Sequence, residues 1–486
     1  MPDQQRAAAT RGEAGGAPAD RRGREVLIVG AGIAGLAAAY ELRQYDLGVA
    51  IVERRHRAGG LIITERIGDY LVDAGADSFL TSKPGAVQLC RELGLEDHLI
   101  SMSPPRTAFV LRRGRLVPIP EGAVLGIPRS ALAILSSSLF SIPARLRMLL
   151  EPLSTSRPLN AGDESIDAFI ARRFGREAAT VIGGALLAGI HAGDPKRLSV
   201  RALFPRLVEA ETEHGSILRA LRRPQVSDSG GMFRALAGGA GELISRLEDT
   251  IAVRPCYGTG VRSIELVGAA ATPRYRLVLE DGGTLEAGAV ILALPAFEIA
   301  RLTASFDPSL AQLCGQIPYV SSATIVLAYA RQAVRHPLNG SGFVVPRDEP
   351  YELLAATWVS SKWARRAPEG HVLLRAFVGG RGHETKLQLD DEALTGLAHR
   401  ELAAILGLEG APEFARVYRW EQATPQYEIG HLDRVAAIGA RTTRWPGLFL
   451  TGSGLRGTGI PDAITDARST ASRAARYVMG HDSMSR

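Results

Sequence analysis

The stretch EVLIVGAGIAG at residues 25–35 decides the fold of this chain, and the helix-forming LAAAYELRQ follows it at residues 36–44. An apolar run that ends in glycine is typical of a buried parallel strand. The first glycine permits a tight turn, the second lets the backbone approach a pyrophosphate, and the third allows close packing of the next helix, whose free N–H groups bind phosphates. The expected cofactor contacts are Gly30, Gly32, Ile33, Ala34 and Gly35.

A second apolar run, at residues 48–52, ends in Glu53. An acid about 20 residues after the glycine motif bonds a ribose hydroxyl in dinucleotide-binding folds. It also disfavours NADP, whose extra phosphate would meet a negative charge. The order of strand, glycine turn, helix, strand and acid predicts a Rossmann-like α/β domain, and it leaves both NAD and FAD open.

The residues that follow favour FAD. Residues 53–60, ERRHRAGG, resemble the E-x-x-x-R-x-G-G extension of the flavin amine oxidases and their relatives. In this resemblance Arg57 is a cation positioned for phosphates, while Gly59 and Gly60 leave room for the flavin. Residues 68–79, GDYLVDAGADSF, resemble the second conserved stretch of the same family. The predicted cofactor is therefore FAD.

Three later segments resemble the porphyrinogen oxidases of haem synthesis, namely AGIHAGDPKRLSV at 188–200, PQYEIGHLDRV at 425–435 and TGSGLRGTGIPDAI at 451–464. A glycine-rich turn before a helix is also, by itself, a place where N–H groups meet an anionic or electron-rich ring edge. The resemblance covers nearly everything after residue 24. It implies flavin contacts at Gly452, Gly459 and Ile460, an adenine contact through the backbone of Val261, and a substrate-pocket glycine at Gly189.

One arginine is a candidate for substrate binding. The family commonly has an arginine directly before the aromatic residue of a middle segment, where it holds a propionate of the substrate. Here Ala108 precedes Phe109, and the nearest arginine on that side is Arg106. Arg106 is therefore the candidate propionate partner, and an exposed arginine without this role is the alternative.

The resemblance implies a split, Rossmann-like FAD-binding domain, a mixed-sheet α+β substrate-binding domain and a helical membrane-associating domain that forms a lid over the substrate. Residues 1–24 are expected to be a disordered tail, because they are rich in Ala, Gly and Arg and contain no apolar core of a secretory signal. The expected boundaries are 25–95, 229–297 and 419–480 for the FAD-binding domain, 96–228 for the helical domain and 298–418 for the substrate-binding domain.

The apolar residues between 123 and 150 recur at helical spacing, with arginines at both ends. Such a stripe is compatible with a helix that lies in a bilayer interface, and equally with an ordinary core helix. The uncharged stretch at 130–144 is shorter than the roughly 20 apolar residues that a spanning helix needs. We expect no membrane-crossing segment and a cytoplasmic protein, with peripheral attachment to the cytoplasmic membrane left open.

Composition excludes several other classes of protein. The formal net charge is +6, yet no stripe of Lys and Arg with interleaved aromatic residues supports nucleic-acid binding. The three cysteines, Cys90, Cys256 and Cys314, show no C-x-x-C spacing, which argues against a disulfide framework and against a metal site. A reducing compartment is the natural expectation.

The reaction implied by the resemblance is the oxidation of a porphyrinogen to a porphyrin by an oxygen-dependent flavin oxidoreductase. Six hydrogens leave in three flavin cycles, and oxygen is reduced to hydrogen peroxide. Protoporphyrinogen IX and coproporphyrinogen III are both open as substrates. No acid–base residue is nominated, because His191 and His431 are expected to orient backbone rather than transfer protons.

Other functions remain in competition with this one. A different flavin amine oxidase-type oxidase, a carotenoid desaturase or a non-catalytic flavoprotein of the haem pathway would share the N-terminal motifs. Residues 451–464 contain neither an aromatic residue nor a cysteine, which disfavours an amine oxidase. The expected partners are the porphyrinogen and molecular oxygen, with a membrane surface, ferrochelatase or another haem-pathway enzyme, and a second copy of the chain as further options.

Overall fold

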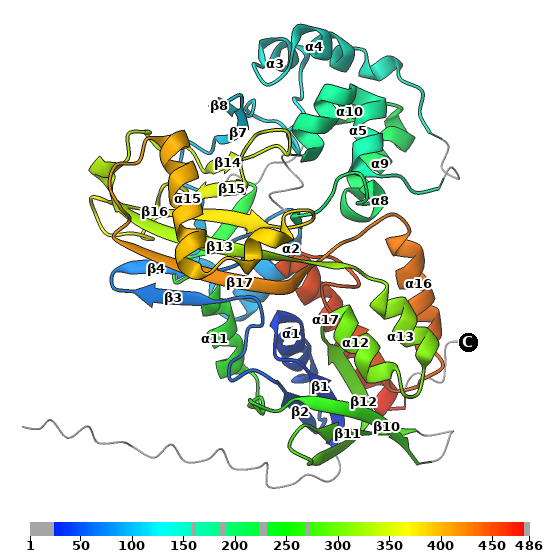
Figure 1. Ribbon diagram of the computed structural model, residues 1–486. Helices are drawn as coiled ribbons and strands as arrows, with labels where there is room; N and C mark the ends of the chain where they lie inside the picture. The colour runs from blue at the N-terminus through cyan, green and yellow to red at the C-terminus, as the bar shows by residue number, and fades with distance from the viewer. Residues whose placement is uncertain (1–23, 158–161, 185–190, 223–230, 269–272, 481–486) are drawn as a thin grey trace, which may run out of the picture.

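The computed structural model describes residues 24–157, 162–184, 191–222, 231–268 and 273–480. These residues form three parts that follow one another along the molecule (Figure 1). A six-stranded sheet with its helices lies at one end, a seven-stranded sheet lies in the middle, and a group of helices lies at the other end.

The six-stranded sheet is built around short apolar strands that are buried on both faces. Four strands run parallel in the order β2–β1–β12–β18, and the first half of β12 also carries the antiparallel pair β11–β10. Parallel strands end at one edge of a sheet, so the loops that follow them meet there. The strands are β1 (Arg24–Val29), β2 (Val49–Val52), β10 (Val261–Val267), β11 (Arg274–Leu279), β12 (Thr284–Ala293) and β18 (Leu448–Thr451).

Helices cover both faces of the parallel part of this sheet, which explains why its parallel strands are mostly apolar. One core packs Ile28 and Ile51 against α1, α2, α11 and α17, and the other packs Leu27 and Val290 against α12, α13 and α16. The helices are α1 (Ile33–Leu42), α2 (Pro84–Glu92), α11 (Gly241–Thr250), α12 (Ala296–Thr303), α13 (Pro308–Gly315), α16 (His431–Thr442) and α17 (Ile460–Val478).

The seven-stranded sheet has the order β17–β13–β16–β15–β14–β7–β8. Long apolar strands with β-branched and aromatic residues form its centre, and α15 (Asp391–Leu406) packs on it. The hairpin β7–β8 joins this sheet through a parallel pair between β7 and β14. The strands are β7 (Ala108–Arg112), β8 (Arg115–Pro118), β13 (Tyr319–Ala330), β14 (Gly342–Val344), β15 (Leu353–Trp358), β16 (His371–Gly379) and β17 (Phe414–Pro425).

The described residues also form two small sheets and a short helix after β15. One sheet pairs β3 with β4, and the other has the order β5–β9–β6. The helix α14 (Val359–Lys362) follows β15 directly. The strands are β3 (Thr64–Ile67), β4 (Tyr70–Asp73), β5 (Phe79–Leu80), β6 (Leu99–Ser101) and β9 (Phe233–Leu236).

The helical part has its own apolar core, to which β7 contributes Val110. The segment 96–228 therefore supplies a hairpin to the seven-stranded sheet as well as these helices. No helix within the described ranges is long and apolar enough to cross a membrane. The helices are α3 (Ala131–Ser136), α4 (Ile142–Leu149), η2 (Glu151–Leu153), α5 (Ile166–Phe174), α6 (Arg176–Ala178), the π-helix η3 (Ala179–Gly184), α8 (Val200–Leu203), α9 (Pro205–His214) and α10 (Ile217–Leu221).

Candidate functional site

The N-terminal glycine turn lies between β1 and α1. Gly30 has a φ of 102°, which side chains rarely permit, and its N–H donates to the carbonyl oxygen of Val52 at 2.8 Å. A Cβ atom on Gly30 would lie 2.5 Å from the carbonyl oxygen of Ala293, and one on Gly35 would lie 1.8 Å from that of Gly30. Both glycines are needed for the fold itself, because no larger residue fits between α1 and the sheet.

Gly32 has a different environment, since the space beside it is open. A Cβ atom there would find only the Cα of Gly60 within 4 Å, at 3.9 Å. Gly59 and Gly60 bring their own turn alongside, and the Gly59 N–H donates to the carbonyl oxygen of Ala31 at 2.9 Å. Gly32 is the N-cap of α1, and no side chain in the described part of the chain caps this helix. The N–H groups of its first turn, from Ile33, Ala34 and Gly35, are thus available to an anion.

Glu53 directly follows β2 and reaches the glycine turn. One carboxylate oxygen accepts the Ala31 N–H at 2.7 Å, and the other accepts the Arg55 N–H at 2.8 Å. The predicted ribose-binding acid therefore lies beside the predicted phosphate-binding turn. This proximity is what a dinucleotide requires.

Arg57 is half-buried and points into the turn that contains Gly59 and Gly60. Its guanidinium donates to the carbonyl oxygens of Ala58 at 2.9 Å, Gly60 at 2.8 Å and Ile62 at 3.4 Å. Burial, together with the charge of Arg55, lowers the pKa of Arg57 from its ordinary value. In this arrangement Arg57 shapes the backbone of the turn.

The C-terminal glycine turn lies between β18 and α17. Gly452 has a φ of 129°, and a Cβ atom on it would lie 3.1 Å from the carbonyl oxygen of Leu294. Gly459 is the N-cap of α17, again without a side-chain cap among the described residues, and Ile460 begins the helix. This turn repeats the geometry of the first one, with a parallel strand, a glycine turn and an uncapped helix start.

The two glycine turns meet at the end of β12. Gly30 lies against the carbonyl oxygen of Ala293, and Gly452 lies against the carbonyl oxygen of the next residue, Leu294. The two helices also pack against each other, since Arg468 of α17 donates to Glu41 of α1 at 2.7 Å. The sequence predicted both turns, and the structure brings them together at one edge of the parallel sheet (Figure 1).

Val261 begins β10 and lies on the Glu53 side of this edge. Its side chain is buried in the core, and its carbonyl oxygen accepts from Arg301 at 2.8 Å. The preceding segment runs beside the end of β2, where the Thr259 N–H donates to the carbonyl oxygen of Glu53 at 2.8 Å. The backbone of Val261 is therefore close to the predicted ribose-binding acid.

The residues present fit a flavin dinucleotide. The sheet edge offers an open glycine face at Gly32, two uncapped helix starts and the carboxylate of Glu53. These are N–H donors for a pyrophosphate and an acceptor for a ribose hydroxyl. Within the described residues, no group of three or more His, Cys, Asp or Glu could hold a metal ion.

The two residues predicted to bind the substrate are Gly189 and Arg106. Gly189 lies outside the described residues. Arg106 is exposed, its Nε donates to the carbonyl oxygen of Met102 at 3.2 Å, and its guanidinium lies against Gly231. Gly231 in turn accepts a hydrogen bond at 3.2 Å from Thr81, two residues before Lys83.

A lysine connects this region to the C-terminal turn, and a buried histidine lies near that lysine. Lys83 pairs with Asp462, in the first turn of α17, at 2.6 Å. His191 is buried nearby, and burial together with the charge of Lys83 lowers its pKa to about 4. His191 is thus neutral near pH 7, and the role expected for it stays a prediction.

A buried ionic cluster around Asp77 is a feature that no sequence pattern predicted. Its carboxylate accepts from Lys362 at 3.2 Å, from Arg375 at 2.8 Å and from the indole N–H of Trp363 at 3.2 Å. Burial alone would raise the pKa of Asp77, but the two cations hold it well below its usual range. Because Arg375 also donates to the carbonyl oxygen of Gly75 at 2.8 Å, the cluster joins the seven-stranded sheet to residues 73–77.

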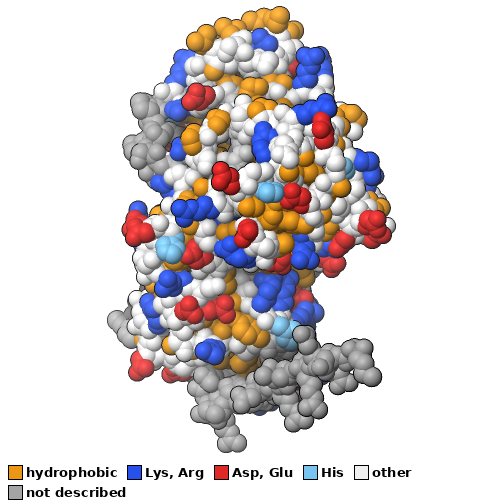
Figure 2. Space-filling view, turned by 90° about the vertical axis from the view of Figure 1, so that its left-hand side faces the viewer, with side chains coloured by type: hydrophobic (Ala, Val, Ile, Leu, Met, Phe, Trp, Pro, Cys, Tyr) orange, Lys and Arg blue, Asp and Glu red, His pale blue; other side chains and the backbone are white. Residues whose placement is uncertain are grey.

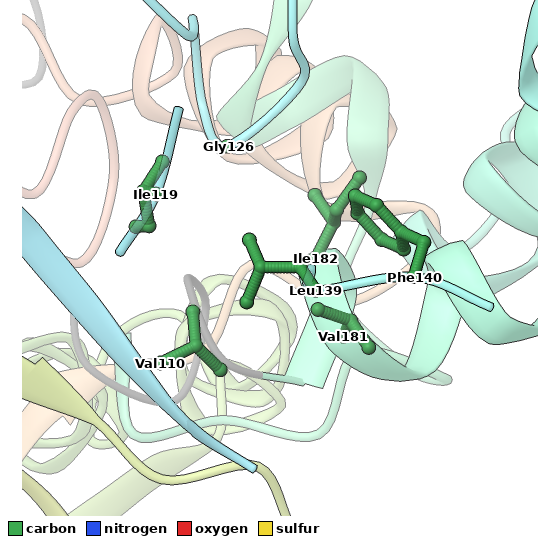
Figure 3. A pocket seen from close by; sticks show the side chains of 7 residues that line it. All are labelled: Val110, Ile119, Gly126, Leu139, Phe140, Val181 and Ile182. Carbon is green, nitrogen blue, oxygen red and sulfur yellow. The ribbon is translucent and has the colours of Figure 1, made fainter. Parts of the chain in front are cut away.

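An apolar cavity lies inside the helical part, where side chains from β7, the α3–α4 connection and η3 point toward a common space (Figure 3). It has no lining side chain that could pair with a carboxylate. A propionate-bearing substrate would therefore not be held there. The lining residues are Val110, Ile119, Gly126, Leu139, Phe140, Val181 and Ile182.

The chain is similar to known proteins over most of its length. The family model described as flavin containing amine oxidoreductase matches residues 33–475. The coproporphyrinogen III oxidase of Bacillus subtilis (strain 168) is 32% identical, covering 94% of this chain and 98% of that protein. The chloroplastic protoporphyrinogen oxidase of Oryza sativa subsp. japonica is 28% identical, covering 96% and 91%. A crystal structure from Exiguobacterium sp. 255-15 superposes with a TM-score of 0.83 at 30% identity, covering 94% and 99%.

Proposed function

The chain belongs to the family of flavin-containing amine oxidoreductases, with FAD as its cofactor, and from this premise we propose that it oxidises coproporphyrinogen III to coproporphyrin III in haem biosynthesis. Its mixed α/β fold is that of the flavin amine oxidases. The observation that carries the proposal is the meeting of the two glycine turns at the end of β12, in a chain that is similar to porphyrinogen oxidases over more than nine-tenths of its length.

The proposed role of the chain is to bind, orient and shield. The N–H groups at the start of α1 and α17 would hold the anionic and electron-rich parts of FAD, and Glu53 would bond the ribose. FAD, when bound, supplies the acceptor for pairs of hydrogens and passes their electrons to molecular oxygen. Burial of the surrounding sheet edge would keep water away from the reacting atoms.

Coproporphyrinogen III is proposed over protoporphyrinogen IX because of the relatives. The protein of Bacillus subtilis that carries the first name is more similar to this chain than the rice protein that carries the second. The two substrates differ at two side chains, which are propionates in the former and vinyl groups in the latter. Arg106 is proposed to pair with a propionate, and its exposed position beside Gly231 leaves its guanidinium accessible to a ligand.

Turnover of both substrates tests the proposal. The FAD-loaded protein, mixed with each porphyrinogen in air, is expected to produce porphyrin fluorescence much faster from coproporphyrinogen III. Arg106→Ala should raise KM for that substrate while FAD stays bound, and Arg113→Ala, on the exposed β7–β8 turn, is the matched control. A holoprotein that oxidises neither substrate would refute the proposal.

We also propose that the helical part rests on an anionic membrane surface. Large apolar side chains gather at the end of the molecule formed by α3, α4 and η2, and their exposed fractions reach 77% at Leu132 and 78% at Leu153 (Figure 2). Cations border this apolar face: Arg129 donates to the carbonyl oxygen of Leu221 at 2.9 Å, which places the exposed Arg222 near the start of α3. Apolar anchors beside cations suit anionic lipid head groups. The apolar face consists of Leu132, Leu135, Ile142, Leu146, Leu150 and Leu153.

Vesicle binding tests this second proposal. The protein should co-sediment with vesicles that contain phosphatidylglycerol and bind less to vesicles of phosphatidylcholine alone. The triple variant Leu132→Ser, Leu146→Ser, Leu153→Ser should lose most of this binding, whereas Leu266→Ser with Leu389→Ser, at exposed leucines elsewhere, should not. If the triple variant instead converts a dimer to a monomer, the face is covered by a second copy and the membrane proposal fails.

Other partners follow from the proposed reaction. Molecular oxygen is the proposed electron acceptor, with hydrogen peroxide as its product. In haem synthesis the porphyrin product is passed to an enzyme that inserts iron or to another enzyme of the pathway. Ferrochelatase therefore stays a predicted partner, on the basis of the proposed reaction only.

A further inference from the structure

The segment Pro425–His431, termed the junction segment below, belongs to one of the sequence motifs, yet the proposed chemistry assigns it no role. It starts at the last residue of β17 and ends at the first residue of α16. Its side chains Gln426, Tyr427 and His431 are exposed by 1%, 3% and 0%, which is unusual for a connection between elements. Such burial indicates that the segment has partners on several sides.

The first partner is the C-terminal glycine turn. The Tyr427 hydroxyl donates to the carbonyl oxygen of Ser453 at 2.6 Å, and Nε2 of His431 lies 3.1 Å from that of Leu455. The two rings stack with centroids 3.7 Å apart and planes 13° apart, so each fixes the other. Both therefore act on consecutive parts of the turn that we propose for the flavin.

His431 acts as a neutral donor. Burial lowers its pKa to about 4, so the ring carries one proton near pH 7. A carbonyl oxygen only accepts, so the proton must be on Nε2 for the contact with Leu455 to be a hydrogen bond. His431 thus holds the turn without contributing a charge beside the cofactor.

The second partner is the segment 191–199, in which the helical part carries another of the motifs. The Gln426 side-chain amide donates to the carbonyl oxygen of His191 at 3.0 Å, the Ser199 N–H donates to that of Tyr427 at 2.8 Å, and the Ile429 N–H donates to that of Arg197 at 3.0 Å. The contact is thus made by backbone and side chains together, along the whole junction segment.

Ionic contacts reinforce the same connection. Glu428 pairs with Arg197 at 2.9 Å and also with Arg381, which follows β16. Asp163 accepts from the Gly430 N–H at 3.2 Å and from the Ser199 hydroxyl at 2.9 Å. The junction segment therefore binds the helical part and the seven-stranded sheet at once, while its own rings hold the glycine turn.

We propose that Tyr427 and His431 are positioning residues that fix the C-terminal glycine turn and couple it to segment 191–199 of the helical part. Binding of FAD at the turn would stabilise segment 191–199 through the junction segment. The inference rests on the proposed FAD site, and it does not depend on which substrate is oxidised.

FAD affinity and amide hydrogen exchange test the inference, because a merely structural role would not link them. In the wild-type chain, added FAD should slow exchange at residues 191–200. Tyr427→Phe keeps the ring and loses the donor, and His431→Leu loses the donor as well. Each should weaken FAD binding about ten-fold or more, as loss of a buried hydrogen bond does, and should abolish the slowing at 191–200.

Two further variants separate coupling from stability. His431→Gln retains an N–H donor near the position of Nε2 and should recover most of the FAD affinity. Tyr329→Phe removes the 2.8 Å contact between another buried tyrosine, in β13, and His399 of α15. It should leave FAD affinity and exchange at 191–200 unchanged.

The possible outcomes are distinct. If FAD does not slow exchange at 191–200 in the wild-type chain, the coupling is absent and the inference is wrong, even if the variants fail to fold. Wild-type affinity in both Tyr427→Phe and His431→Leu would equally overturn it. A chain that binds FAD but oxidises no porphyrinogen would contradict the proposed function alone.

Discussion

Gly32 and Gly35 belong to one motif but differ in what surrounds them. A Cβ atom on Gly35 would lie 1.8 Å from a backbone oxygen, whereas one on Gly32 has its nearest neighbour at 3.9 Å. Gly35→Ala should therefore yield little folded protein, while Gly32→Ala should fold normally and bind FAD at least about ten-fold more weakly, because its methyl group fills the phosphate approach. Thermal unfolding without cofactor and titration with FAD measure the two effects. Equal FAD affinity of Gly32→Ala and the wild type would show that the pyrophosphate does not bind beside Gly32.

Asp77 carries a prediction about stability. Asp77→Asn leaves Lys362 and Arg375 without a counter-charge in a buried site, which typically costs about 3–5 kcal/mol. The free energy of unfolding in urea measures the loss. The control is Asp348→Asn, whose partner is Arg112 and whose side chain is 47% exposed, because such a pair contributes about 1 kcal/mol or less. Similar losses for both variants would contradict the assignment of Asp77 to a buried cluster.

Residues that act through local backbone geometry could be predicted from the sequence, and residues that act through distant partners could not. Gly30, Glu53 and Gly452 follow strands, so a strand pattern and a glycine place them. Asp77 is an ionic partner of Arg375, which lies about 300 residues later in the chain. No local sequence pattern contains both residues, so their pairing could not be predicted. Arg106 is an intermediate case. It was identified from its place in a segment that resembles the family, and its role in binding the substrate stays a prediction.

At the scale of elements, α1 and α17 depend on small residues for their close approach. Ala467, Ala471 and Ala474 of α17 are completely buried in the core that α1 shares. Ala471→Leu should cost about 1–3 kcal/mol by overpacking. It should also weaken FAD binding, because it moves the two helix starts that we propose to serve one cofactor site. Ala436→Leu, on the exposed side of α16, is the matched control and should change neither quantity. Unchanged FAD affinity in Ala471→Leu would show that the helix starts do not act together.

The hairpin β7–β8 shows why elements are easier to predict than their neighbours. Its sequence lies in a segment that the resemblance assigned to the helical domain, yet β7 pairs in parallel with β14, more than 200 residues later. The strand with which the free edge of the hairpin pairs is determined by the assembled sheet and not by the hairpin sequence. The apolar spacing at 123–150 similarly predicted helices, and only the structure separates the exposed leucines of α3 and α4 from the buried Ile134 and Met148.

At the scale of the whole molecule, His191 and His431 predict a pH dependence of stability. Burial lowers the pKa of each to about 4 in the folded chain, against about 6.5 in the unfolded chain. The unfolded chain therefore binds more protons below pH 6.5, so stability is full above that pH and falls as the pH drops toward 4. The loss is on the order of 3 kcal/mol for each histidine. Urea unfolding between pH 4 and pH 7 measures it, and His431→Gln should lose part of the slope; an unchanged slope would contradict this assignment.

The parallel sheet draws its strands from opposite regions of the chain, with β1 and β2 before residue 53 and β18 after residue 447. The ribosome synthesises the first glycine turn long before the second. For most of its synthesis the growing chain therefore contains only one of the two turns proposed to bind the cofactor. Flavin capture must then wait until α17 has left the exit tunnel. Chains stalled or cut before residue 448 should accumulate as pale, protease-sensitive species, while those that extend past α17 turn yellow.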